Sequence, residues 1–172
     1  MKDFLELLEG INYAFVHYRG LKRISLDLPY VIHPIRVTMI LRAAGYDDFE
    51  NKDLFLAALF HDLLEDTNIS YEDLKKVYGD HVASIVMELT KPKDYNKEEW
   101  LRSFNLASNE AKIIKMADRI DNLLDMNLTS WTKEKQRKYA EQGLIILKNC
   151  KETNKGLATK LKELIDRILE SL

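Results

Sequence analysis

Cysteine is almost absent from this chain, because only Cys150 among the 172 residues carries a thiol. A lone thiol excludes an internal disulfide and is typical of proteins in a reducing compartment, so we expect a cytoplasmic protein. Proline and glycine are also scarce, with three and six residues respectively. Because these two residues interrupt helices most strongly, their scarcity favours helices over an architecture of short strands and turns.

Long apolar runs are missing as well, and with them the usual marks of a membrane span or a signal peptide. The 28 acidic and 26 basic side chains nearly balance and are interleaved along the chain. Such interleaving gives neither the basic face of a nucleic-acid-binding protein nor an acidic tail. We therefore expect no nucleic-acid partner, no membrane association and a single domain over residues 1–172, a length that can bury a full core.

Apolar residues recur at helical spacing from one end of the chain to the other. No segment shows the two-residue alternation of a half-buried strand. The sequence therefore predicts an all-α fold, a compact domain of several helices. The expected helices are residues 3–19, 35–44, 53–64, 70–79, 80–90, 98–106, 108–126, 132–150 and 156–171.

The most informative segment is the apolar run Leu54–Phe60 and the charged residues that follow it. Seven consecutive apolar residues predict a helix that is buried on most sides. The ionisable residues His61, Asp62, Glu65 and Asp66 come directly behind this run. Burying charges without partners is costly, so such a cluster must be paired, bound to a cation or open to water.

Helical geometry places the four ionisable side chains on two adjacent faces. At about 100° per residue, His61 and Glu65 share one face, and Asp62 and Asp66 share the next. An imidazole beside several carboxylates suits a divalent cation and a water molecule to be activated. The alternative is a polar helix end that is capped and solvated. From these residues alone both interpretations stay open.

Other polar residues have ordinary structural explanations when they are considered singly. His33 lies at a junction between a loop and a helix, where a histidine is more often a cap or a packed residue than a ligand. Asp118 and Asn122 lie one turn apart on the polar side of a predicted helix, which suggests a solvated face. Lys22 and Arg23 could clamp a nucleotide, although cations in loops are usually solvated. No glycine-rich phosphate loop occurs, so phosphate chemistry would depend on a metal and basic side chains.

Five motifs, taken together, resemble those of the HD-domain phosphohydrolases. The resemblance is closest to the (p)ppGpp hydrolase domains of the Rel/SpoT type and their small stand-alone relatives. The motifs follow the family's order at nearly its spacing, over about residues 10–140. They are Pro29-Tyr-x-x-His33-Pro34, Ala57-Ala-Leu-Phe-His61-Asp62-Leu-Leu-Glu65-Asp66-Thr67, Tyr78-Gly-x-x-Val82-Ala83, Leu89-Thr-Lys-Pro-Lys93 and Ile114-Lys115-Met-Ala117-Asp118-Arg119-x-x-Asn122.

The resemblance implies an orthogonal helical HD-domain fold that holds one divalent cation, typically Mn²⁺. On the family pattern, two histidines and two aspartates bind this cation. Two imidazole nitrogens and two carboxylate oxygens leave open positions for water and a phosphate oxygen. The resemblance thus replaces the structural explanations given above for His33 and Asp118. The implied ligands are His33, His61, Asp62 and Asp118.

The resemblance also implies the catalytic groups and the substrate. Glu65 and Asp66 match the family's catalytic pair, which orients and deprotonates the attacking water, with Glu65 closer to the role of the base. The implied reaction removes the 3′-pyrophosphate from (p)ppGpp and gives GDP or GTP and pyrophosphate. The implied contacts to the nucleotide are Lys22, Arg23, Lys93, Asn122 and Tyr139.

Two departures from the family pattern bear on the substrate. The order Lys22-Arg23 reverses the family's Arg-Lys pair, and Asp121 precedes Asn122 where the family commonly has a histidine. The alternatives are therefore a phosphohydrolase of another nucleotide, such as a nucleoside monophosphate or a 2′/3′-phosphate, and a catalytically silent nucleotide-binding module. Retention of all implied ligands and both carboxylates argues against the silent module, because binding alone needs no activated water.

Overall fold

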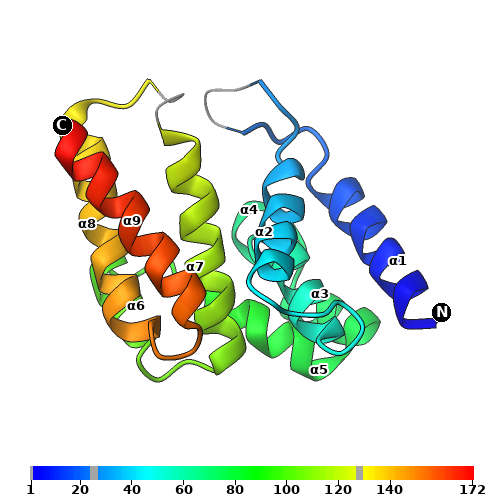
Figure 1. Ribbon diagram of the computed structural model, residues 1–172. Helices are drawn as coiled ribbons and strands as arrows, with labels where there is room; N and C mark the ends of the chain where they lie inside the picture. The colour runs from blue at the N-terminus through cyan, green and yellow to red at the C-terminus, as the bar shows by residue number, and fades with distance from the viewer. Residues whose placement is uncertain (1, 24–26, 127–129) are drawn as a thin grey trace. The chain divides into compact units, whose positions relative to one another are not determined.

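A computed structural model describes residues 2–23, 27–126 and 130–172 of the chain. These residues form helices and connecting segments, and their only strand-like pairing is one isolated antiparallel bridge between Lys22 and Pro29. The all-α prediction is therefore confirmed (Figure 1). The helices are α1 (Lys2–His17), α2 (Ile32–Ala43), α3 (Lys52–Phe60), α4 (Leu63–Asp66), α5 (Tyr71–Leu89), α6 (Lys97–Ser103), α7 (Asn109–Leu124), α8 (Lys133–Cys150) and α9 (Lys155–Ser171).

The helices fall into two compact units. The first unit contains α1 to α5 and ends at Lys91, and the second begins at Pro92 and contains α6 to α9. The expectation of a single domain over residues 1–172 stays a prediction. Among the described residues, no helix combines the length and the apolar character that a bilayer span requires.

Helix α3 forms the centre of the first unit and packs against α1, α2 and α5. All seven residues of Leu54–Phe60 are buried, as the uninterrupted apolar run predicts. Helix α1 approaches closely because Gly10 has no side chain: a Cβ there would lie 2.6 Å from Leu56 Cδ2. The buried helix α3 therefore fixes the position of whatever follows Phe60.

Local sequence signals set the ends of α5. Ser70 and Asp73 form a capping box, in which each side chain accepts a hydrogen bond from the other residue's backbone N–H. Gly79 interrupts the helix with a φ of 86°, a conformation that costs other residues more than glycine. The predicted boundary between residues 79 and 80 is thus present as a kink inside α5.

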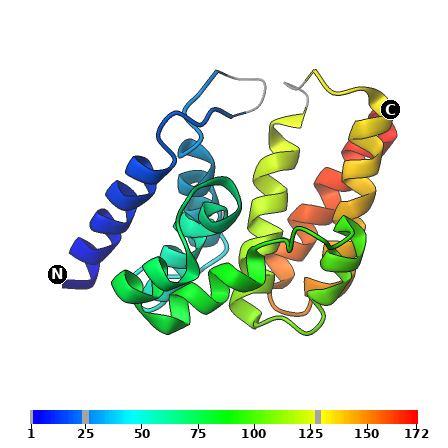
Figure 2. The same cartoon turned by 180° about the vertical axis from the view of Figure 1, so that it is seen from behind.

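In the second unit, α7 packs against α8 and α9, and α6 packs against α8 (Figures 1 and 2). Ser108 caps α7, because its side chain accepts a hydrogen bond from the backbone N–H of Ala111. Gly143 allows a close approach of α8 to α9, since a Cβ there would lie 2.9 Å from Ile165 Cδ1. Cys150 is buried, and burial raises the pKa of its thiol to about 12, as expected for an inert cysteine.

Candidate metal centre

Two histidines from neighbouring helices meet in the first unit. His33 lies in the first turn of α2, and His61 directly follows α3. Helix α2 begins three residues earlier than predicted, and Pro34 is tolerated because the first turn needs no backbone donor there. Since α2 packs against α3, both imidazoles are turned inward and each is only 1% exposed. Their Nε2 atoms lie 3.2 Å apart.

The tautomer of His61 is defined by the hydrogen bond of its second ring nitrogen, Nδ1. Its Nδ1 lies 2.8 Å from the carbonyl oxygen of Ala58. A carbonyl can only accept, so Nδ1 carries the proton and donates it, which leaves an electron pair on Nε2 of the neutral ring. Metal-ligating histidines are commonly oriented in this way by a backbone carbonyl.

Asp62 brings an oxygen to the same point. Its Oδ2 lies 2.9 Å from His61 Nε2 and 3.8 Å from His33 Nε2. Two ring nitrogens and one carboxylate oxygen therefore converge, and their electron pairs repel one another unless a cation or proton lies among them. Imidazole and carboxylate donors suit divalent first-row metals. The donor set of the first unit thus fits a divalent cation.

Asp118 lies on α7 in the second unit, and it is buried with its own partners. Lys115 Nζ lies 2.9 Å from Asp118 Oδ2, and the side-chain amide of Asn122 donates a hydrogen bond to Oδ1. Lys115 also lies over the ring of Trp100, 4.5 Å from its centroid. The solvated face that periodicity alone suggests for this helix is wrong, because Lys115, Asp118, Arg119 and Asp121 are all buried.

Glu65 and Asp66 lie in the short helix α4, which begins directly after Asp62. The backbone N–H of Lys91 donates a hydrogen bond of 2.6 Å to Glu65 Oε1. Burial, followed by the charges of Asp62 and Glu65, raises the pKa of Asp66 to about 6, although hydrogen bonding to Tyr30 opposes the shift. A carboxylate with a proton affinity close to neutrality is suited to general base catalysis.

The raised pKa of Asp66 predicts a pH-dependent gain in stability for Asp66→Asn in the metal-free protein. The folded-state pKa of about 6 exceeds the ordinary aspartate value of 3.8, so the fold binds this proton more tightly. The linked stabilisation is complete below pH 3.8 and is lost as the pH rises through about 6. Asparagine is neutral throughout, so the variant should unfold at a higher temperature than the wild type near pH 7.5.

We expect the gain to be about 1 kcal/mol, or about 2–4 °C, because the side chain of Asp66 is only partly buried and solvent screens its charge. The measurement is thermal unfolding of both metal-free proteins at two pH values. Below pH 3.8 the two unfolding temperatures should converge, since the wild-type carboxyl is then protonated in both the folded and the unfolded state. An equal difference at both pH values would contradict the assigned pKa.

The predicted nucleotide contacts are distributed over both units. In the first unit, Lys22 is exposed and pairs with Asp27, and the backbone N–H of Arg23 donates to the carbonyl of Leu28. In the second unit, Lys93 is exposed in the segment before α6. Asn122 lies on α7, and Tyr139 lies on α8.

Two residues that sequence reasoning leaves aside contact predicted site residues. The Arg119 guanidinium lies over the ring of Tyr139, 3.8 Å from its centroid, and Arg119 Nη1 donates to the Tyr139 carbonyl. The Tyr30 hydroxyl donates a hydrogen bond to Asp62 Oδ2. Both residues lie within the five sequence motifs, Tyr30 in the first and Arg119 in the last. Their position in these motifs could have identified them from the sequence.

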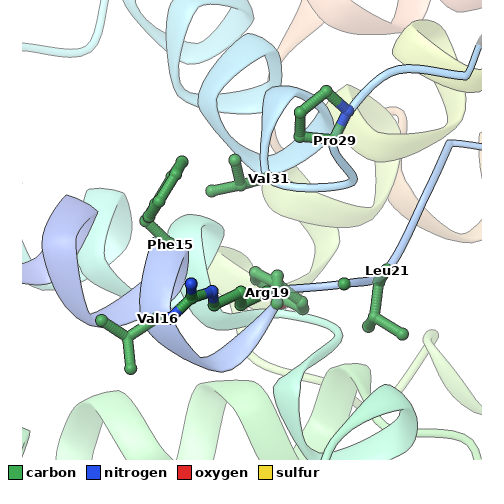
Figure 3. A pocket seen from close by; sticks show the side chains of 8 residues that line it. Phe15, Val16, Arg19, Leu21, Pro29 and Val31 are labelled. Carbon is green, nitrogen blue, oxygen red and sulfur yellow. The ribbon is translucent and has the colours of Figure 1, made fainter.

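A separate hollow of about 510 Å³ lies in the first unit beside the end of α1 (Figure 3). Its walls are mostly apolar, and none of the predicted site residues lines it. It therefore differs from the candidate metal centre, although its wall includes Tyr18, whose ring packs on Tyr30. The lining residues are Phe15, Val16, Tyr18, Arg19, Gly20, Leu21, Pro29 and Val31.

Comparison with known proteins defines the class. Residues 11–147 match the model of the HD domain family, so the chain belongs to this family. Among curated relatives, the guanosine-3′,5′-bis(diphosphate) 3′-pyrophosphohydrolase MESH1 of Drosophila melanogaster is 34% identical over 167 residues, which cover 92% of each chain. The MESH1 protein of Homo sapiens is 32% identical over 168 residues, again covering 92% of each chain.

A solved structure shows the same relationship in three dimensions. It is described as a metazoan ortholog of SpoT that hydrolyzes ppGpp and plays a role in starvation responses. It superposes on this chain with a TM-score of 0.83 and 34% sequence identity, over 94% of both chains. The fold and family expected from the five motifs are therefore confirmed.

Proposed function

We propose that this protein is a metal-dependent pyrophosphohydrolase that removes the 3′-pyrophosphate from (p)ppGpp. The observation that carries the proposal is the convergence of His33, His61 and Asp62 donor atoms immediately before the carboxylates of α4. The proposed substrate is supported by the MESH1 relatives, which are named for this reaction and match 92% of the chain. The products are GDP or GTP and pyrophosphate.

The proposed metal ligands are His33, His61, Asp62 and Asp118, and the proposed cation is Mn²⁺. Asp118 is assigned on the family pattern. Its support is that Asp118 is buried and that Lys115 and Asn122 orient its two carboxylate oxygens. When bound, the cation would act as a Lewis acid, which polarises a phosphate oxygen and lowers the pKa of water.

The chain's own carboxylates provide the proton transfer. Glu65 and Asp66 orient the attacking water and accept its proton, while its oxygen forms a new bond to the phosphorus on the 3′-oxygen. The bond between this phosphorus and the 3′-oxygen breaks, and the 3′-oxygen leaves with the proton that the carboxylates took from the water. The hydrogen bond from the Lys91 backbone restrains Glu65, and the raised pKa of Asp66 supports its part in the transfer.

Basic and polar side chains are proposed to hold the nucleotide. Lys22, Arg23 and Lys93 supply positive charges for the phosphates and the base, and each charge-assisted hydrogen bond contributes about 1.5–3 kcal/mol. Asn122 donates its amide hydrogen to Asp118, so its carbonyl oxygen can accept a hydrogen bond from the nucleoside. Tyr139, whose ring Arg119 covers, forms another part of the pocket.

Hydrolysis of a nucleotide panel tests the substrate. We expect the Mn²⁺-loaded protein to release pyrophosphate and GDP from ppGpp and to leave GDP intact. The panel should include a nucleoside monophosphate and a nucleotide with a 2′-phosphate, with products separated by anion-exchange chromatography. Faster cleavage of either of these than of ppGpp would establish the alternative phosphohydrolase, which the reversed Lys22-Arg23 pair favours. It would leave the metal centre and the roles of the carboxylates unchanged.

A further inference from the structure

Tyr30 contacts two of the three donor residues in the first unit. Its hydroxyl donates a hydrogen bond to Asp62 Oδ2, the same oxygen that lies 2.9 Å from His61 Nε2. Its ring packs edge-on against the His33 imidazole, with the centroids 5.7 Å apart and an interplanar angle of 67°. One side chain thus touches both a carboxylate and an imidazole of the cluster.

The position of Tyr30 is itself restrained from several sides. Its backbone N–H donates to the carbonyl of Leu21 at 3.0 Å, and its carbonyl accepts from the backbone N–H of His33 at 2.9 Å. Its ring packs on the buried ring of Tyr18, with the centroids 5.2 Å apart. Contacts on the backbone and on the ring therefore hold the hydroxyl in place beside Asp62.

The Tyr30 hydroxyl can serve only as a donor to Asp62. A carboxylate accepts hydrogen bonds, so the hydroxyl is the donor in its contact with Oδ2. This role as a hydrogen-bond donor distinguishes Tyr30 from the proposed metal ligands and from Glu65 and Asp66, which are proposed to move protons.

We propose that Tyr30 is a positioning residue of the metal centre, which holds the Asp62 carboxylate toward the two histidine Nε2 atoms and supports the His33 ring. The inference rests on the proposed metal centre and is independent of the nucleotide that the protein cleaves. Groups that hydrogen-bond to a metal ligand commonly contribute 10–100-fold to metal affinity. Tyr30 therefore strengthens metal binding through Asp62 without contacting the metal.

Metal binding by Tyr30→Phe tests the proposal, because phenylalanine keeps the ring and removes only the hydroxyl. We expect the Kd for Mn²⁺, measured by isothermal titration calorimetry without nucleotide, to rise by about 10–100-fold. The visible spectrum of the Co²⁺-loaded variant should also change, since the Asp62 oxygen shifts relative to the metal. Tyr30→Ala should bind Mn²⁺ still more weakly, because His33 also loses its ring contact.

The matched control is Tyr78→Phe, which removes the hydroxyl of another half-buried tyrosine in the same unit. Tyr78 packs on Phe60, with ring centroids 4.6 Å apart, and burial raises its pKa to about 12. Its Mn²⁺ affinity should equal that of the wild type, and thermal unfolding of the metal-free proteins should show that Tyr30→Phe is folded.

A wild-type Mn²⁺ affinity and Co²⁺ spectrum in a folded Tyr30→Phe would overturn the proposal. An equal loss of affinity in Tyr78→Phe would also overturn it, because the effect would then come from general packing. Since no nucleotide is present in these measurements, failure of the (p)ppGpp reaction would leave them unchanged. The two proposals can therefore fail separately.

Discussion

His61→Ala and Asp62→Ala should each abolish bound Mn²⁺ and hydrolysis together. His61 Nε2 lies close to both other donor atoms of the first unit, 3.2 Å from His33 Nε2 and 2.9 Å from Asp62 Oδ2. Removing either residue takes away one of only four proposed protein ligands. We expect activity to fall by about 10³-fold or more, a loss of about 4 kcal/mol of transition-state stabilisation. Metal content after dialysis, measured by mass spectrometry, and turnover should fall in parallel.

His81→Ala is the matched control for this experiment. His81 belongs to α5 of the same unit and is exposed, so its removal should change neither metal content nor rate. If either ligand variant keeps its full metal content, the assigned coordination shell is wrong. Loss of metal in the control as well would show that the substitutions disturb the fold of the unit.

The elements that sequence predicts well are those with strong local signals. The apolar run Leu54–Phe60 predicts a buried helix because no polar side is left for solvent, and α3 is that helix. The Ser70 capping box and the Gly79 boundary depend on neighbouring residues only, so both could be predicted. Such signals also fix His61 and Asp62, since both follow directly from the end of α3.

The polar face of α7 shows where local reasoning stops. Periodicity counts residue types around a helix, and it cannot recognise that Lys115 and Asn122 satisfy Asp118 within that face. These partners lower the free-energy cost of burying Asp118. Charged residues are therefore buried on a helix face that the pattern predicts to be solvated. Only the resemblance to a family indicated that Asp118 has a role.

His33 and Tyr30 illustrate the limit for contacts between distant residues. His33 meets His61 because α2 packs on α3, and the hydrogen bond from Tyr30 to Asp62 joins residues 32 positions apart. Neither contact can be derived from spacing along one helix. The family's motif indicated that His33 belongs with His61, whereas the contact of Tyr30 with Asp62 could be found only in the structure.

Glu65→Gln and Asp66→Asn should keep the metal and lose most of the turnover. Each change preserves size and polarity but removes a base, so kcat should fall by about 10²–10⁴-fold, the usual contribution of general acid–base catalysis. Glutamine also retains a carbonyl oxygen that can accept the hydrogen bond from Lys91, so the local backbone should be preserved. Rates under saturating ppGpp and Mn²⁺, with metal content measured on the same samples, check this prediction.

Glu9→Gln provides the control, because it makes the same chemical change at an exposed position of α1. Its kcat should match the wild type, which excludes a general effect of removing one negative charge. Wild-type rates in both Glu65→Gln and Asp66→Asn would mean that the cation alone activates the water. A loss in only one variant would assign the base to that carboxylate. A loss of metal from either variant would instead place its carboxylate in the coordination shell.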